Sequence, residues 1–338
     1  MRPARKIFFL FLLFILSACQ SSLPSDLLTQ TPAPAFTLPV PPTAAPTATA
    51  PPTGTSAPTL TVTPALGARR VLILSIDGLR PDIISLAPMP NLLDLMQNSA
   101  YSLSAQTILP SATLPSHASM LGGYCPDIHG VHWNDYIPEN GVAIGTDLFD
   151  ISQAAGLQTV MYAGKEKLQQ VTEPSSLDQF VFINDRDLVI AEQLIQNFPA
   201  DFGLLFVHFP IVDGMGHQYG WLSPEQLSVA FRADEALKMI LDELEARGLR
   251  KETLVIVTAD HGGHDTSHGS SRPEDMTIPW IASGPGIRPG QLTTTVHTMD
   301  TAATAAFALG LQPPDDWDGV PVYEAFGLPV EEASTQCE

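Results

Sequence analysis

Carboxylate and imidazole side chains follow three apolar runs of the sequence, close to the point where each run ends. They are Asp77 after the run at 71–76, Asp213 and His217 after the run at 202–209, and Asp260 and His261 after the run at 253–258. Such side chains bind zinc, manganese and similar ions. A single Asp after a strand more often caps a helix, and a single His is more often structural. The same ligand types at three run ends together indicate a metal centre.

The spacing within these segments allows neighbouring ligands to face the same site. Asp213 and His217 are four residues apart, so on one helical turn their side chains point the same way. Asp260 and His261 are adjacent, and a strand would send them to opposite faces. The two glycines that follow them allow the chain to turn, so that both side chains can face one ion.

A fourth segment, 109–120, is rich in hydroxyl side chains. A hydroxyl at the start of a helix lies among free N–H groups, which stabilise developing negative charge. Next to a metal ion, such a hydroxyl can ionise and attack phosphorus. Ser111, Thr113 and Ser116 are all candidates, and chemistry alone does not choose between them. Each of the three can instead be a cap or a turn residue.

The elements that must position these residues follow from the apolar patterns. Strands are expected at 71–76, 159–162, 202–209 and 253–258, and helices at 89–98, 147–155, 188–197 and 223–247. Strands that alternate with helices predict an α/β fold with a largely parallel sheet and helices on both faces. Ligand sites in such sheets lie beyond the carboxyl ends of the strands, where the candidate ligands occur.

Five motifs occur in order along the chain: Asp77-Gly, Pro110-x-x-Thr113-x-Pro115-x-His117, His129-Gly-x-x-x-Asn134, Asp213-x-x-Gly-His217 and Asp260-His261-Gly. As a set they resemble the alkaline phosphatase superfamily and, within it, the type I phosphodiesterase/nucleotide pyrophosphatase group. The resemblance covers residues 71–326, and the segment 317–322 is similar to the superfamily's C-terminal end. It implies an alkaline-phosphatase-like three-layer sandwich with a mostly parallel central sheet.

The resemblance also implies roles that the residues alone do not fix. Thr113 matches the nucleophile, and Asn134 matches a side chain that holds a non-bridging phosphate oxygen. Two divalent ions, with zinc expected, would be bound by Asp77, Asp260 and His261 at one site and by Asp213, His217 and His268 at the other. His264 and His297 are alternatives to His268. The implied activity is two-metal hydrolysis of a phosphate ester through a phospho-threonine intermediate, of the phosphodiesterase/nucleotide pyrophosphatase type.

Lys165 and Lys167 follow the expected strand at 159–162 and can border the site. In phosphonoacetate hydrolases, which belong to the same superfamily, a similar Lys-x-Lys contacts the substrate. Extra cations suit a dianionic phosphate monoester or a phosphonate-carboxylate better than a monoanionic diester. A phosphomonoesterase or a phosphonoacetate-hydrolase-like enzyme is therefore an alternative, as is a solvated role for both lysines.

Two further alternatives come from other functional classes. A sulfatase of this fold would carry Cys/Ser-x-Pro-x-Arg, and Cys125-Pro126 has neither the spacing nor the Arg. A non-catalytic binding lipoprotein could keep the fold without turnover, although the full set of ligands argues against it.

The N-terminus predicts export and anchoring. Residues 1–18 have the pattern of a signal peptide, with basic residues before a short apolar run. Leu-Ser-Ala-Cys19 resembles a bacterial lipobox, which implies a lipidated Cys19 and an extracytoplasmic protein anchored to a bacterial membrane. An uncleaved anchor helix or an ordinary signal peptide is the alternative. The Pro- and Thr-rich residues 19–65 are expected to be a disordered tether, 66–330 the catalytic domain and 331–338 a disordered tail.

The chain is strongly acidic, with a net charge of −20 from 36 acidic and 16 basic residues. This balance argues against binding a nucleic-acid polymer through a basic surface, so a small phosphate ester and the anchoring membrane are the expected partners. Bound divalent cations would let so acidic a chain hold an anionic substrate. Cys125 and Cys337 remain after Cys19, and nothing in their spacing supports a bridge between them.

Overall fold

The computed structural model describes residues 67–330 and 334–337. The predicted signal peptide, Cys19, the tether and part of the predicted tail lie outside these residues. Within the described residues, no helix combines the length and the apolar character that a membrane span needs.

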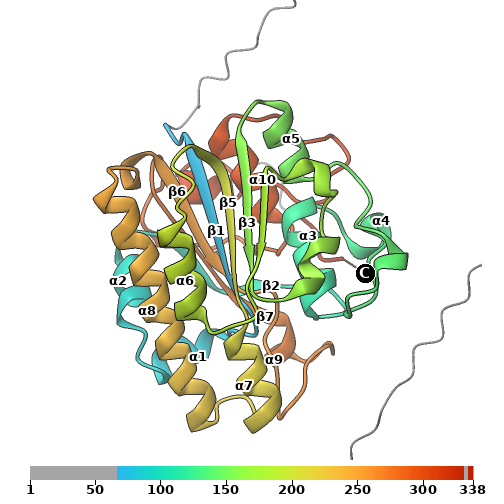
Figure 1. The fold of residues 1–338 in the computed structure, drawn as a ribbon, viewed down its shortest axis with the longest axis vertical. Coiled ribbons are helices and arrows are strands. Elements are labelled where there is room, and N and C mark those ends of the chain that lie inside the picture. Colours follow the sequence, from blue (N-terminus) through green and yellow to red (C-terminus); the bar gives the residue numbers. More distant parts are fainter. Residues whose placement is uncertain (1–66, 331–333, 338) are drawn as a thin grey trace, which may run out of the picture. The chain divides into compact units, whose positions relative to one another are not determined.

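The core of the fold is one eight-stranded sheet with the order β4-β3-β5-β1-β6-β7-β2-β8 (Figure 1). The strands are β1 (Arg70–Ile76), β2 (Ala100–Gln106), β3 (Gln158–Ala163), β4 (Gln179–Phe182), β5 (Phe202–Phe209), β6 (Thr253–Thr258), β7 (Thr277–Ser283) and β8 (Gly290–Gln291). From β4 to β6 all neighbouring strands are parallel, and β7 is antiparallel to both β6 and β2. The predicted α/β class and mostly parallel sheet are confirmed.

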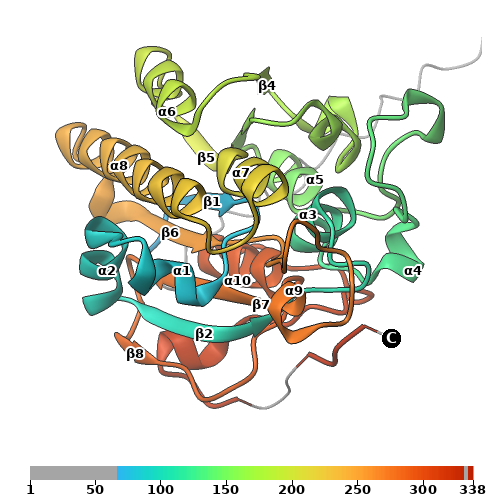
Figure 2. The same cartoon turned by 90° about the horizontal axis from the view of Figure 1, so that it is seen from below.

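Helices cover both faces of the sheet and make the three layers (Figure 2). One face carries α1 (Pro81–Leu86), α2 (Pro90–Gln97), α6 (Asp187–Gln196) and α8 (Pro224–Ala246), and the other carries α3 (Thr113–Gly122), α5 (Leu148–Ala154) and α10 (Asp300–Leu309). The short helices α4 (Pro126–His129), α7 (Ile211–Tyr219) and α9 (Pro273–Met276) lie in connections. In α8, the Ser223 side chain accepts a hydrogen bond from the Gln226 N–H and caps the helix, as its sequence predicts.

The central strands are buried along their whole length because helices lie on both of their faces. Every residue of β5 and β6 is buried, and so is every residue of β1 after Arg70. Ile76 pairs with Phe209 and Ser75 pairs with Thr258, so β1, β5 and β6 end almost level. The residues that follow these strands therefore emerge at the same edge of the sheet.

A disulfide joins Cys125 to Cys337, across 212 residues of sequence. The sequence spacing does not predict this pairing. Near it, the Ser334 hydroxyl lies 2.8 Å from His297 Nδ1 and donates to Asp300 Oδ2 at 2.9 Å. Residues 334–337, part of the predicted tail, are thus held against the domain.

Asp187 begins α6 and is buried. Its Oδ1 accepts a hydrogen bond from the Ile211 N–H, but its Oδ2 has no hydrogen-bond partner among the described residues. Burial raises the pKa of Asp187 to about 7. The folded protein therefore binds this proton more tightly than the unfolded chain, so stability falls as the pH rises from about 4 to 7.

Asp187→Asn should stabilise the protein more at alkaline than at acidic pH, because it removes a buried charge that forms as the pH rises. We expect the gain in unfolding free energy to be about 2 kcal/mol larger at pH 8 than at pH 5. Urea unfolding of wild type and variant at both pH values measures this difference in unfolding free energy. Asp185→Asn, at an exposed neighbouring carboxylate, is the matched control. An equal effect of Asp187→Asn at both pH values would contradict the assignment.

Candidate active site

The candidate site lies at the carboxyl ends of four neighbouring strands, β3, β5, β1 and β6. Lys165 follows β3, Asp77 follows β1, and Asp260 follows β6. After β5 the chain enters α7 within two residues, and this short helix carries Asp213 and His217 one turn apart. The sheet thus gathers residues that are far apart in sequence, as the strand-end pattern predicts.

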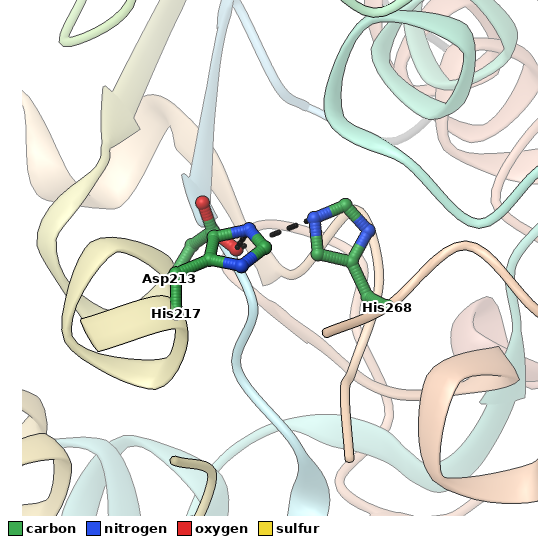
Figure 3. A group of neighbouring side chains, drawn as sticks. All are labelled: Asp213, His217 and His268. Carbon is green, nitrogen blue, oxygen red and sulfur yellow. Dashed lines mark ion pairs between the residues drawn. The ribbon is translucent and has the colours of Figure 1, made fainter. Parts of the chain in front are cut away.

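Asp213, His217 and His268 form the first cluster of metal-binding atoms (Figure 3). Asp213 Oδ1 lies 3.3 Å from His217 Nε2 and 3.6 Å from His268 Nε2. The Nδ1 atoms of the two rings face the backbone carbonyls of Thr266, at 3.0 Å, and Ser111, at 2.9 Å. A carbonyl oxygen can only accept, so each Nδ1 carries a proton, and each ring directs its Nε2 toward the carboxylate. Such a set of carboxylate and imidazole atoms suits a cation.

Asp77, Asp260 and His261 form the second cluster. His261 donates from Nδ1 to the Gly262 carbonyl at 2.8 Å, while its Nε2 lies 3.4 Å from Asp77 Oδ1 and 3.4 Å from Asp260 Oδ2. The Asp213 carboxylate lies between the two clusters, because ligand atoms of Asp77, Asp213 and His261 are within 4.8 Å of one another.

Four buried polar atoms of these clusters lack a hydrogen-bond partner among the described residues. They are Asp77 Oδ1, Asp213 Oδ1, Asp260 Oδ2 and His261 Nε2. Buried polar groups are nearly always paired, because an unpaired one loses its hydration without compensation. All four are acceptors or metal-ligand atoms, so the donor set fits divalent cations of the zinc type.

The two buried carboxylates of the second cluster have opposite pKa shifts. Burial alone would raise the pKa of Asp77, but Lys165, His208 and His261 together hold it well below its usual value. Burial and the neighbouring Asp77 charge raise the pKa of Asp260. Burial and the nearby His261 lower the pKa of His268 to about 4. His268 is therefore neutral near pH 7, which is the form that binds a metal ion.

Thr113 is the hydroxyl residue that lies at the two clusters. It is the first residue of α3, is fully buried, and places Oγ1 3.5 Å from Asp77 Oδ2. Ser111 instead donates to the Ser270 carbonyl at 2.9 Å, and Ser116 accepts from the Thr107 hydroxyl at 3.1 Å. The geometry thus favours Thr113 among the three candidates left by the sequence.

Asn134 lies beside the start of α3. Its Oδ1 accepts from the Leu114 N–H at 2.9 Å and from Lys167 Nζ at 3.0 Å. Lys167 Nζ also donates to the Asn134 carbonyl at 2.6 Å. With Oδ1 accepting both of these hydrogen bonds, the orientation of the Asn134 amide is fixed, and its Nδ2 group is the donor of this side chain.

Lys165 lies inside the site rather than at its border. Its Nζ forms ion pairs with Asp213 Oδ2 at 2.6 Å and Asp77 Oδ2 at 2.7 Å, and donates to Thr113 Oγ1 at 3.1 Å. Burial lowers the pKa of Lys165, but the two carboxylates outweigh it and raise the pKa above its usual value. Lys165 is therefore a permanent cation in this arrangement.

The two alternative histidines lie apart from the first cluster. His264 Nδ1 pairs with Asp275 Oδ1 at 2.6 Å, and His297 Nδ1 contacts the Ser334 hydroxyl. Of the three histidines considered for this position, His268 is the one that the structure brings to Asp213.

Two buried histidines that support the site are absent from the sequence-based list of site residues. His208, on β5, lies with Nε2 2.8 Å from Asp77 Oδ2 and accepts from the Gly164 N–H at Nδ1, so Nε2 must be the protonated nitrogen. His117, on α3, contacts the Thr113 carbonyl at 2.7 Å. The only sequence signal for His208 is its position in an otherwise apolar strand. His117 is part of the motif at 110–117, but the motif assigns it no role.

Comparisons with known proteins find related sequences and structures. The family model for type I phosphodiesterase/nucleotide pyrophosphatase matches residues 71–278. An uncharacterized pyrophosphatase/phosphodiesterase of Schizosaccharomyces pombe is 25% identical over 58% of this chain and 45% of its own length. The catalytic subunit of human GPI ethanolamine phosphate transferase 2 is 28% identical over 78% of this chain and 28% of its own length. The chain thus spans less than half the length of these curated relatives.

Among solved structures, murine ectonucleotide pyrophosphatase/phosphodiesterase 5 superposes with a TM-score of 0.66 at 16% identity. The match covers 77% of this chain and 99% of the murine chain. An inactive variant of that protein, with one threonine replaced by alanine and AMP bound, matches with a TM-score of 0.65 and the same identity, over 76% of this chain and 98% of that chain. These likenesses show the alkaline-phosphatase-like fold. With its family model matching more than half of the sequence, the chain belongs to the type I phosphodiesterase/nucleotide pyrophosphatase family.

Proposed function

We propose that the protein is a metal-dependent phosphoester hydrolase in which Thr113 is the nucleophile. The observation that carries this proposal is a buried threonine hydroxyl beside two clusters of carboxylate and imidazole side chains, in which four buried atoms lack a hydrogen-bond partner among the described residues. Family membership supports the reaction class. The murine relative with a threonine-to-alanine change is described as inactive and in complex with AMP, which supports a threonine nucleophile and a nucleotide-like ester.

Two divalent ions, with zinc expected, would be held by the two clusters. Asp213, His217 and His268 would bind one ion, and Asp77, Asp260 and His261 the other. Bound there, the ions would supply Lewis-acid charge for the phosphate oxygens and lower the pKa of the attacking group. The tautomers fixed by the backbone carbonyls of Thr266, Ser111 and Gly262 already present Nε2 of each ring to its ion.

The residues of the chain would then carry the transfer itself. Thr113 Oγ attacks phosphorus in line with the leaving oxygen and forms a phospho-threonine, which water cleaves in the second half of the reaction. The amino end of α3 stabilises negative charge at this position. Asn134, which Leu114 and Lys167 fix by its Oδ1, donates from Nδ2 to a non-bridging phosphate oxygen.

For the substrate, we propose a phosphodiester or pyrophosphate bond of a small nucleotide-like molecule. Family membership and the AMP complex of the murine relative support it. A monoesterase or a phosphonoacetate-hydrolase-like activity is the second candidate, because Lys167 keeps one ammonium N–H beyond its two bonds to Asn134. That free donor would suit an additional anionic oxygen. A non-catalytic binding lipoprotein is the third candidate. Wild-type protein that binds its metal ions but turns over no phosphate ester would favour it.

We propose an extracytoplasmic location with a lipid anchor at Cys19. The Cys125–Cys337 disulfide supports this location, because such bridges persist in oxidising compartments and are rare in the cytosol. The signal peptide and lipobox pattern of residues 1–19 is the second support.

Thr113→Ala should abolish turnover while leaving the metal clusters intact. We expect kcat on an aryl phosphodiester to fall at least about 1,000-fold, because the attacking oxygen is removed. Ser116→Ala, which removes a hydroxyl of the same helix away from the clusters, should keep near-normal activity. Full metal-dependent activity of Thr113→Ala would show that the nucleophile is misassigned.

His268→Ala should lower the bound metal from about two ions per chain to about one, because the first cluster loses a ligand. His264→Ala is the comparison, since His264 pairs with Asp275 and not with Asp213. Metal analysis of both purified variants measures the difference. The ligand assignment fails if His264→Ala loses the ion and His268→Ala keeps it.

Lys167→Ala should reduce activity on a phosphate monoester more than on a diester, because it removes a cation that can meet the second negative charge of a monoester. We expect roughly a tenfold difference between the two losses in kcat/KM. Lys251→Ala, at an exposed lysine of the same charge, should change neither. Equal losses on both substrates would rule out charge recognition by Lys167.

A further inference from the structure

Three protein oxygens lie close to the ammonium group of Lys165. It donates hydrogen bonds to Asp213 Oδ2 at 2.6 Å and to Thr113 Oγ1 at 3.1 Å, and it forms an ion pair with Asp77 Oδ2 at 2.7 Å. Two of its three contacts are therefore to carboxylates. This distinguishes Lys165 from Lys167, whose two contacts both go to Asn134.

The two carboxylates use different oxygens for Lys165 and for the histidine clusters. Asp213 and Asp77 direct Oδ2 to Lys165, while Oδ1 of each faces the imidazole nitrogens and lacks a hydrogen-bond partner among the described residues. His208 adds a second contact to Asp77 Oδ2. Lys165 can therefore stay in place when ions bind at Oδ1, but it shares the same two carboxylates with them.

The charge balance of the site depends on this one side chain. The side chains of Asp77 and Asp260 are 0% exposed, and that of Asp213 is 4% exposed. A buried carboxylate without a counter-charge is costly. Among the described residues, Lys165 is the only Lys or Arg that pairs with any of the three. Without metal ions, only Lys165 and neighbouring imidazoles compensate the cluster.

Local packing holds Lys165 in this position. Gly164 precedes it and donates from its N–H to His208 Nδ1 at 3.2 Å. A Cβ at Gly164 would lie 2.4 Å from the Pro210 ring, so only glycine lets the chain pass this closely to the end of β5. The backbone thereby brings Lys165 to Asp77, which follows β1, and to Asp213 on α7.

We propose that Lys165 is an internal counter-ion of the metal-binding carboxylates, which stabilises the metal-free fold and weakens the binding of the ions. The inference rests on the proposed metal-dependent function. In the metal-free protein Lys165 neutralises Asp77 and Asp213. When ions bind, they take over that role, and the ammonium then repels them. Lys165 would thus let the domain fold before it is loaded with metal.

Lys165→Met tests this proposal, because it keeps an unbranched side chain of nearly the same length and removes the charge. Thermal unfolding is measured on metal-free and zinc-loaded protein, and zinc affinity by competition with a chromophoric chelator. We expect the variant to lower the midpoint of the metal-free protein more than that of the loaded protein, and to lower the zinc Kd at least about tenfold. If the variant folds only with zinc, as circular dichroism would show, the proposal is also supported.

Two further variants control for charge and position. Lys165→Arg keeps the cation and should restore most of the stability of the metal-free protein, whereas Lys167→Met removes an equal charge nearby and should change zinc affinity less. An unchanged zinc affinity in Lys165→Met would overturn the proposal in favour of a contact to substrate. A weaker zinc affinity in Lys165→Met would also overturn the proposal, because it would show that Lys165 orients the metal ligands. Wild-type protein that binds no zinc would overturn the metal-dependent function itself.

Discussion

Three aspartates are buried at one edge of a single sheet, and their negative charges must be balanced within the protein or by bound ions. Asp77 and Asp260 follow strands β1 and β6, and Asp213 lies in α7, the short helix that begins two residues after β5. Their placement requires the parallel order β5-β1-β6 and the level ends of these strands. Among the described residues, Lys165 is the one Lys or Arg side chain that pairs with any of these carboxylates. The arrangement of carboxylates and imidazoles therefore suits bound cations.

The groups around the aspartates have separate origins and roles. The β3 end supplies Lys165, the start of α3 supplies Thr113, and the loop before β7 supplies His268. The loop with Asn134 has its own support: Gln170 accepts from the Ile137 N–H at 2.9 Å and donates to the Ile137 carbonyl at 2.7 Å. This loop is thus supported by contacts separate from those of the carboxylates at the strand ends.

Much of the fold follows from the sequence because its central strands are apolar and buried on both faces. The sequence predicts β1, β5 and β6 for that reason. It predicts α8 from its amphipathic spacing and its Ser223 cap. The sequence patterns do not predict strands β2 and β7 on the antiparallel side of the sheet, or helix α10. β2 mixes buried and exposed positions, and β7 contains Pro279. The Ala-rich α10 is buried nearly all round, so it lacks an amphipathic pattern.

The same limits apply to the site. Strand ends predict where ligands gather, but the choice of Thr113 over Ser111 depends on where α3 begins, and that of His268 over His264 on the fold of one loop. The Cys125–Cys337 pairing spans 212 residues, a separation over which no local pattern acts. His208 was missed because a single histidine in an apolar strand is usually structural. These features depend on tertiary contacts.

The most direct test of a two-cation centre is anomalous diffraction at the zinc absorption edge, on crystals of the protein grown with zinc. We expect two strong anomalous peaks in the site. One should lie between Asp213, His217 and His268, and the other between Asp77, Asp260 and His261, with Lys165 still paired with Oδ2 of Asp77 and Asp213. Absence of both peaks in fully active protein, or peaks only at surface carboxylates, would contradict a two-cation centre.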